Sequence, residues 1–229
     1  MHLQTLQTAL NGFGLLLRGG FHPGPGEDLT LEDAPAGRPS TLVLIGNAGR
    51  RFWPAFSKQR RTEADPLDAW TRRVLNQVAD GFGARPLFPF DGPPYLPFQQ
   101  WALRAEAVSP SPIGPLIHPT YGLWHAYRGA LLFETMIDLP ALQPQASPCE
   151  KCPDKPCLSS CPAEALKAGA YDVPACLDHL ESRHGESCLS GGCLARSACP
   201  VGREYAYEEA QARFHMEHFR AAQRTEQQD

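Results

Sequence analysis

The chain has 229 residues, of which 42% are hydrophobic, and a formal net charge of −4. This length allows one large domain, or one medium and one small domain, with a real hydrophobic core. The acidic balance argues against a nucleic-acid partner, because a dedicated nucleic-acid binder needs a basic surface to neutralise phosphates. No apolar run approaches the roughly 20 residues that span a bilayer, so no membrane partner is expected either.

The first expected element is a short amphipathic helix within residues 1–20. Its apolar patch, Phe13–Leu17, has no basic segment before it and no small-residue cleavage site after it. Both features are typical of a secretory signal, so their absence predicts a cytoplasmic protein.

A short apolar run, Thr41–Ile45, is bounded by Ser40 and Gly46 and predicts a buried strand. Asp65 and Pro66 then predict the start of a helix, because Asp caps helices and proline suits the first helical position. Five apolar residues follow at helical spacing on one face: Leu67, Trp70, Val74, Val78 and Phe82.

Further elements are expected, in chain order, at strand Arg85–Phe90, helix Pro97–Ala107, strand Arg128–Asp138 and helix Glu204–Arg224. A loop rich in Pro and Gly, Ser109–Tyr127, is longer than a simple connection needs, and such loops are often functional. The segment Leu139–Pro148 is a linker at which the composition changes. We therefore predict two domains, residues 1–140 and residues 141–229.

All eight cysteines lie between residues 149 and 199. They form two runs with Cys176 between them: Cys149-x2-Cys152-x4-Cys157-x3-Cys161-Pro162 and Cys188-x4-Cys193-x5-Cys199-Pro200. Bacterial ferredoxins carry the run C-x2-C-x2-C-x3-C-P, whose fourth cysteine binds the other cluster. The first run differs from it by two extra residues within Pro153–Pro156, and the second run by two in each gap.

Eight thiolates in this arrangement predict two [4Fe–4S] clusters and a protein that moves single electrons. Three closely spaced cysteines wrap one side of a cube, and a distant cysteine supplies the fourth corner. The first cluster would take Cys149, Cys152, Cys157 and Cys199. The second cluster would take Cys161, Cys176, Cys188 and Cys193.

Two other uses of eight cysteines fit the sequence less well. Zinc ribbons would need the same number, but they pair C-x2-C with C-x2-C and do not need Cys-Pro ends. Disulfides are uncommon in chains that lack a secretory signal.

Several segments of residues 40–140 resemble CblC-type cobalamin-processing proteins. They are TLVLIGNAG (Thr41–Gly49), DPLDAW (Asp65–Trp70), IHPTYGLWHAYRGALLF (Ile117–Phe133) and DLP (Asp138–Pro140). The order of four, one and three cysteines resembles epoxyqueuosine reductases and corrinoid reductive dehalogenases. Together these resemblances imply an α+β fold, in which a nitroreductase-like cobalamin-binding domain precedes a small bacterial-ferredoxin-like domain with two [4Fe–4S] clusters.

The CblC resemblance implies a base-off cobalamin, and it places residues at the corrin. The pocket would be lined by His118, Tyr121, Gly122, Trp124, Arg128 and Gly129, and the backbone of Leu131 and Leu132 would meet the corrin amides. No residue is assigned as a catalytic acid or base. Simpler roles stay open: a backbone cap for His118, core packing for Tyr121 and Trp124, and a surface ion pair for Arg128 with Glu134 or Asp138.

The implied function is a cobalamin reductase that removes the upper axial ligand, as in reductive decyanation. Its electron donor would be a ferredoxin, a flavodoxin or a flavoprotein reductase. Trp124 and Arg128 match glutathione contacts of CblC-type proteins, but this chain has cluster cysteines where the family carries its other glutathione-binding arginines, which puts thiol chemistry in doubt. Two alternatives remain: a corrinoid-dependent reductase of an organic substrate, such as epoxyqueuosine or an organohalide, and a ferredoxin-like electron carrier without a corrinoid.

Overall fold

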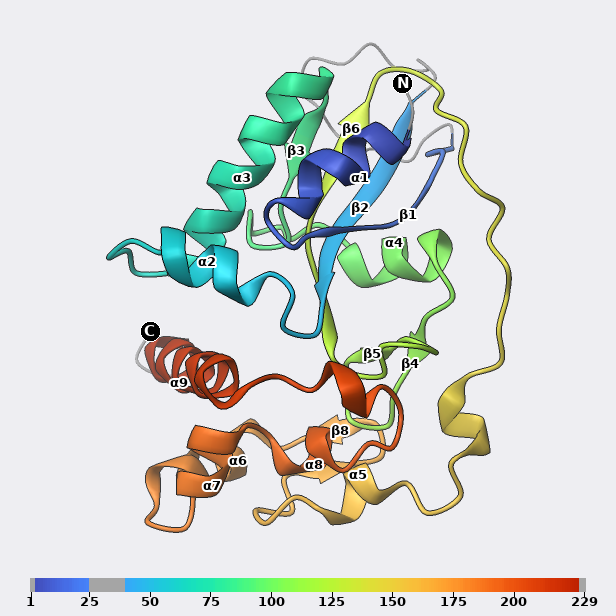
Figure 1. Cartoon of the computed structure of the whole chain (residues 1–229). Coiled ribbons are helices and arrows are strands. Elements are labelled where there is room, and N and C mark those ends of the chain that lie inside the picture. Colours follow the sequence, from blue (N-terminus) through green and yellow to red (C-terminus); the bar gives the residue numbers. More distant parts are fainter. Residues whose placement is uncertain (1–2, 25–39, 227–229) are drawn as a thin grey trace. The chain divides into compact units, whose positions relative to one another are not determined.

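The computed structural model describes residues 3–24 and 40–226, and a four-stranded sheet of order β1-β2-β6-β3 organises its N-terminal part (Figure 1). β1 pairs antiparallel with β2, and β3 pairs antiparallel with β6. The strands are β1 (Leu16–Phe21), β2 (Thr41–Ala48), β3 (Arg85–Leu87) and β6 (His125–Phe133). Every residue of β2 is buried, so both faces of the sheet are covered at this strand.

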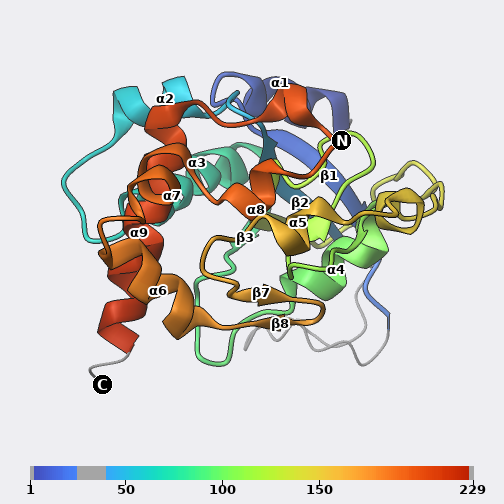
Figure 2. The same cartoon turned by 90° about the horizontal axis from the view of Figure 1, so that it is seen from below.

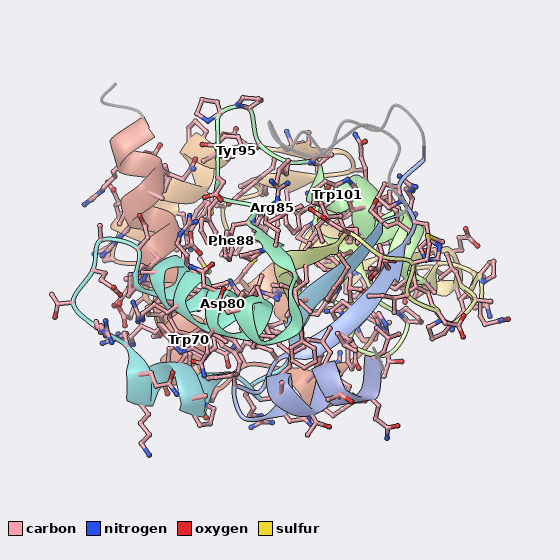
Figure 3. The ribbon with its side chains drawn as sticks, turned by 90° about the horizontal axis from the view of Figure 1, so that it is seen from above. Trp70, Asp80, Arg85, Phe88, Tyr95 and Trp101 are labelled. Carbon is pink, nitrogen blue, oxygen red and sulfur yellow. The ribbon has the colours of Figure 1, made fainter. Side chains whose placement is uncertain are left out.

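Four helices pack on this sheet: α1 (Leu3–Asn11), α2 (Trp53–Gln59), α3 (Pro66–Phe82) and α4 (Phe98–Ala105). α1 contacts both β1 and α3, whereas α4 contacts β1 and β2. Figure 3 shows α3, with Trp70 and Asp80 labelled, beside the chain that leads to Phe88. Trp70 is fully buried and packs against Phe52 and Phe56, which joins α2 and α3 in one aromatic cluster.

The local sequence explains where α3 begins and ends. Pro66 occupies the first turn, where its missing N–H has no intrahelical partner to lose. Asp65 stands at the N-cap position, but its side chain does not make the expected capping hydrogen bond. Gly83 ends the helix with φ +61, a left-handed conformation that favours glycine. The predicted helix start and the predicted strand at 41–45 are therefore confirmed, although β2 extends to Ala48.

Other predicted boundaries differ from the structure. The helix expected within residues 1–20 ends at Asn11, because Gly14 turns the chain with φ +68 into strand β1. The C-terminal helix α9 (Glu209–Glu226) begins five residues later than expected, after a 3-10 turn, η2 (Arg203–Tyr205). The sequence analysis did not predict α2.

The remaining elements are short, and Figure 2 shows them from below. They are β4 (Ser109–Pro110), β5 (Leu116–Ile117), η1 (Pro148–Lys151), α5 (Pro156–Ser159), β7 (Leu166–Lys167), β8 (Ala170–Tyr171), α6 (Val173–Glu181), α7 (Glu186–Gly191) and α8 (Leu194–Ser197). β4 pairs with β5 and β7 pairs with β8, each antiparallel. α9 packs against α6 and α7.

The chain divides into two compact units that do not follow the predicted boundary at residue 140. One unit, the sheet unit, contains Met1–Ala107 and Ala126–Pro144; the other, the cysteine unit, contains Val108–His125 and Gln145–Asp229. The segment 108–125, assigned from the sequence to the N-terminal domain, thus packs with the cysteines. Its residues Ile113, Ile117 and Leu123 share a buried cluster with Leu166, Ala195 and Cys199.

Candidate functional site

The first cysteine cavity is lined by cysteines from both ends of the segment 149–199. Its four cysteines are Cys149, Cys152, Cys157 and Cys199. Cys149 belongs to η1, Cys152 follows it directly, Cys157 belongs to α5, and Cys199 follows α8. The two extra residues of the first run are accommodated by Lys155, which has φ +39 and is the N-cap residue of α5.

The second cysteine cavity collects the other four cysteines: Cys161, Cys176, Cys188 and Cys193. Cys161 follows α5, Cys176 and Cys188 belong to α6 and α7, and Cys193 is the N-cap residue of α8. The structure therefore brings together the same two sets of four that the spacing predicted. Their role as cluster ligands stays a prediction.

Electrostatic interactions between the thiols follow the same division. Burial raises the pKa of the Cys149 thiol, and its neighbours Cys199 and Cys152 raise it further. Burial likewise raises the pKa of the Cys176 thiol, with additional contributions from Cys193, Cys161 and Cys188. Thiols of this kind hold their protons until a metal displaces them, so metal binding here would release protons.

The two cavities are large enough for more than a water molecule. Counted as space open to the centre of a water-sized sphere, the first has a volume of about 20 Å³ and the second about 30 Å³. One water needs about 10–15 Å³ on the same count. Within the part of the chain that the structure describes, no group of three or more His, Cys, Asp or Glu is placed to hold a single metal ion. Four cysteines around a space are the donor set that a [4Fe–4S] cluster takes, so these residues fit that group.

The loop 118–124 packs closely against the residues that follow the second cysteine run. The contact is made at two glycines, one in each segment. A Cβ on Gly122 would lie 2.0 Å from the carbonyl oxygen of Val201, and a Cβ on Gly202 would lie 2.4 Å from the carbonyl carbon of Tyr121. Both glycines have positive φ, +57 and +69. Because Val201 follows Cys199 and Pro200, this contact positions a cysteine of the first cavity.

His118 shapes its own loop. Its backbone exchanges two hydrogen bonds of 2.9 Å with Gly122, and its Nδ1 accepts from the backbone N–H of Thr120 at 3.0 Å and of Tyr121 at 3.1 Å. Its ring stacks on that of Tyr121, with centroids 4.3 Å apart. This geometry matches the simpler reading of His118 as a backbone cap, and a corrin contact stays a prediction.

Trp124 is buried in the cysteine unit and is held by Arg196, which lies between Cys193 and Cys199. The Arg196 guanidinium lies 4.8 Å from the Trp124 ring and 4.6 Å from the Tyr207 ring. It also donates to the carbonyl oxygen of Leu123, from Nε at 3.0 Å and from Nη2 at 2.5 Å. Among the described residues, the Nε1 of Trp124 has no hydrogen-bond partner. Arg196 thereby couples the position of Trp124 to the second cysteine run.

In the sheet unit, Arg128 donates from Nε to Oδ1 of Asn47 at 2.9 Å. An ion pair of Arg128 with Glu134 or Asp138 stays a prediction. Asn47 is fully buried, and its carbonyl oxygen accepts from Arg18, which pairs with Glu106 at 2.7 Å. The Nδ2 of Asn47 has no partner within the described residues, so it remains available as a buried donor for an oxygen-bearing ligand.

The other three predicted corrin residues lie in β6. A Cβ on Gly129 would lie 2.5 Å from Leu75 and 2.9 Å from the carbonyl oxygen of Leu87, so this glycine allows close packing of β3 and α3. Leu131 and Leu132 are buried and pair with Pro86 and Arg85 of β3. β6 lies between β2 and β3, so a ligand contact through the backbone of either leucine would compete with strand pairing.

The sequence analysis missed four polar residues that the structure places at these sites: Asn47, Tyr171, His179 and Arg196. Asn47 and Arg196 had a detectable signal, because Asn47 is a polar residue just after the apolar run 41–45 and Arg196 lies inside a cysteine run. Tyr171 and His179 carry no motif, and their position depends on how β8 and α6 pack around the second cavity.

No helix in residues 3–24 and 40–226 is long and apolar enough to cross a membrane.

Comparison with known proteins identifies the class of fold. No protein-family model matches the chain, and no curated protein sequence matches it. Solved structures do match: the chain has a mixed α and β fold that the cobalamin-processing protein CblC and epoxyqueuosine reductases share.

The individual similarities cover most of the chain at low sequence identity. The B12-trafficking protein CblC of C. elegans, a homologue of human MMACHC, is 16% identical over 96% of both chains, with a TM-score of 0.54. One epoxyqueuosine reductase is 14% identical over 92% of this chain and 68% of its own, with a TM-score of 0.55. Another, solved with an epoxyqueuosine-modified tRNA-Tyr stem loop, is 15% identical over 90% of this chain and 66% of its own, with a TM-score of 0.51. This chain thus spans about two thirds of the length of these reductases.

Proposed function

We propose that this chain is an iron–sulfur, cobalamin-binding reductase that removes the upper axial ligand of cobalamin, with reductive decyanation as the leading case. The sheet unit would form a nitroreductase-like cobalamin-binding domain, and the cysteine unit a ferredoxin-like domain. The observation that carries the proposal is the combination of a CblC-like fold with two cavities that four cysteines each surround.

The cysteines supply the iron-binding part of this function. When bound, two [4Fe–4S] clusters would supply single electrons to the cobalt of the substrate. The thiols of the first and second cavities would bind iron as thiolates, and the protons held by Cys149, Cys157, Cys176 and Cys188 would leave as iron binds. The electrons would come from a ferredoxin, a flavodoxin or a flavoprotein reductase.

Cobalamin is the substrate in this proposal, and polar groups of the sheet unit fit it. There, Asn47 orients the guanidinium of Arg128 and offers Nδ2 as a further donor, which suits the amide oxygens around a corrin. Transfer of one electron to cobalt(III) weakens the bond to cyanide, which leaves with its electron pair.

A thiol-dependent mechanism has little support among the residues of the sheet unit. Residues 1–148 contain no cysteine that could act as a nucleophile or as an axial ligand. A direct supply of electrons from the cysteine unit accounts for the chemistry without glutathione.

The test uses the full chain, reconstituted anaerobically with iron and sulfide. Cyanocobalamin is added first alone and then with a reductant, and absorbance and electron paramagnetic resonance are followed together. We expect a base-off spectrum on binding, and cob(II)alamin with free cyanide on reduction. If neither a base-off species nor cob(II)alamin forms while the clusters are intact, the proposal is wrong.

A second candidate is a corrinoid-dependent reductase of an organic substrate, which the fold similarity to epoxyqueuosine reductase favours. The net charge of −4 gives no excess of positive charge for a tRNA. Turnover of an epoxyqueuosine-modified stem loop by the cobalamin-loaded protein would select this candidate. A plain electron carrier would instead show normal cluster signals and no retention of cobalamin in equilibrium dialysis.

A further inference from the structure

The second cysteine cavity carries a hydroxyl group directed at one of its thiols. Tyr171 of β8 lines this cavity, and its side chain hydrogen-bonds to Cys176 of α6. The Tyr171 ring stacks on Phe219 of α9, with centroids 6.3 Å apart and planes 20° apart. The stacking limits the motion of the ring, and the residue, which is 43% exposed, lines the cavity with its other part.

His179 supplies a second polar group to the same cavity. It follows Cys176 by three residues in α6, a spacing that places both side chains on one face of the helix. Its Nε2 is buried and has no hydrogen-bond partner within the part of the chain that the structure describes. A buried nitrogen without a partner costs free energy, and sulfur atoms bound in this cavity would accept a hydrogen bond from its N–H.

The first cysteine cavity has fewer such donors. Besides its cysteines it is lined by Pro112, Ile117, Pro148, Lys155, Pro156, Pro200 and Val201. Lys155 is exposed, so water and salt screen its charge. Ser147 hydrogen-bonds to the Cys149 thiol, and the Cys157 thiol accepts a hydrogen bond from the backbone N–H of the same residue.

The remaining lining of the second cavity adds to this difference. The Cys188 thiol has hydrogen bonds from Ser187 and from the backbone N–H of Leu194. Tyr171 and His179 are further donors that line the same cavity. The second cavity therefore directs more N–H and O–H groups at sulfur than the first.

We infer that Tyr171 and His179 donate hydrogen bonds to sulfur in the second cysteine cavity and give its cluster the higher reduction potential of the two. This inference rests on the proposed function, because it requires both clusters. Reduction adds negative charge to a cluster, and hydrogen bonds to its sulfur atoms stabilise that charge. The first electron to enter the protein would therefore reside on the second cluster.

The experiment is a redox titration of the full, reconstituted chain, followed by electron paramagnetic resonance. His179→Leu and Tyr171→Phe each remove one donor. We expect each to reduce about tenfold the equilibrium constant for reduction of the higher-potential cluster, which corresponds to about 59 mV for a one-electron couple. His179→Gln keeps an N–H near the position of Nε2 and should restore most of the loss. His184→Leu removes an exposed histidine just beyond α6 and should leave both potentials unchanged.

The two clusters are told apart with Cys161→Ala/Cys176→Ala, which removes ligands of the second cavity. The cluster that remains should titrate at the lower of the two wild-type potentials. The inference is overturned if iron content is normal but neither His179→Leu nor Tyr171→Phe moves a potential, or if the lower potential moves instead. A wild-type chain that assembles no clusters would contradict the proposed function itself, which iron and sulfide analysis shows before any titration.

Discussion

Substitution of Gly122 by alanine tests whether the loop 118–124 is part of the cysteine unit. The new Cβ would lie 2.0 Å from the carbonyl oxygen of Val201, whereas ordinary contacts begin near 3.4 Å. The oxygen belongs to the backbone and the Cβ is fixed by the backbone of residue 122, so one segment has to move by at least 1 Å to reach the 3.0 Å below which real contacts essentially never occur. The residue also has φ +57, which alanine adopts at a cost of about 1–2 kcal/mol.

The two costs can be separated with a matched control. Gly169→Ala, in the turn between β7 and β8, has φ +76 and nothing within 4 Å of the new Cβ. It should lower the free energy of unfolding by about 1–2 kcal/mol from the backbone alone. Gly122→Ala adds overpacking of about 1–3 kcal/mol, so its total should be about 2–5 kcal/mol.

The assay is anaerobic guanidinium unfolding followed by far-ultraviolet circular dichroism, with iron per chain as a second readout. Because movement of Val201 displaces Cys199, Gly122→Ala should also lose iron from the first cavity, whereas Gly169→Ala should keep it. Equal destabilisation by the two variants, within about 0.5 kcal/mol, with equal iron content would refute the contact between residues 122 and 201.

Three further predictions concern the function. Cys161→Ala/Cys176→Ala should lower iron per chain by about half and stop cluster-dependent cobalt reduction while cobalamin still binds; reduction at the normal rate would contradict the electron path. Asn47→Leu removes the Oδ1 that accepts from Arg128 and the unpartnered Nδ2, and it should weaken cobalamin binding about tenfold, measured by equilibrium dialysis, with unchanged iron content; unchanged affinity would exclude Asn47 from the site. Arg196→Lys keeps the charge but loses the paired hydrogen bonds to the carbonyl oxygen of Leu123 and the stacking of the guanidinium on Trp124, so the free energy of unfolding should fall by about 1–3 kcal/mol. A denaturation midpoint equal to wild type would show that the contact is not stabilising.

Patterns of a few adjacent residues predicted those helices and strands that such residues determine by themselves. The run TLVLI indicated β2, and the Asp65-Pro66 pair indicated α3, because burial and capping are written in a few adjacent residues. The cysteine spacing also predicted which four thiols gather at each cavity, since the gaps limit how far each stretch of chain reaches. α2 carries Pro54 and is short, and its position is fixed where Phe52 and Phe56 pack on Trp70.

Features that depend on distant contacts were not predictable from local patterns. The segment 108–125 looks like a loop of the first domain, and its place in the cysteine unit follows from the cluster that Ile117 and Leu123 share with residues 43 to 82 positions later. The pairing of Arg128 with Asn47 spans 81 positions and joins neighbouring strands. A single sequence does not show which of many compatible partners such side chains meet.

The discontinuous course of the cysteine unit limits how it can be used as a building block. A gene fragment that begins at residue 141 would encode all eight cysteines but would omit Ile113, Ile117 and Leu123, half of the buried cluster on which Cys149, Cys157, Cys161 and Cys193 pack. Grafting that fragment onto another enzyme would expose the remaining apolar residues to water and remove Pro112 and Ile117 from the lining of the first cavity. A transplantable version has to supply residues 108–125 as well, either through a circular permutation or through a host loop that reproduces their apolar face.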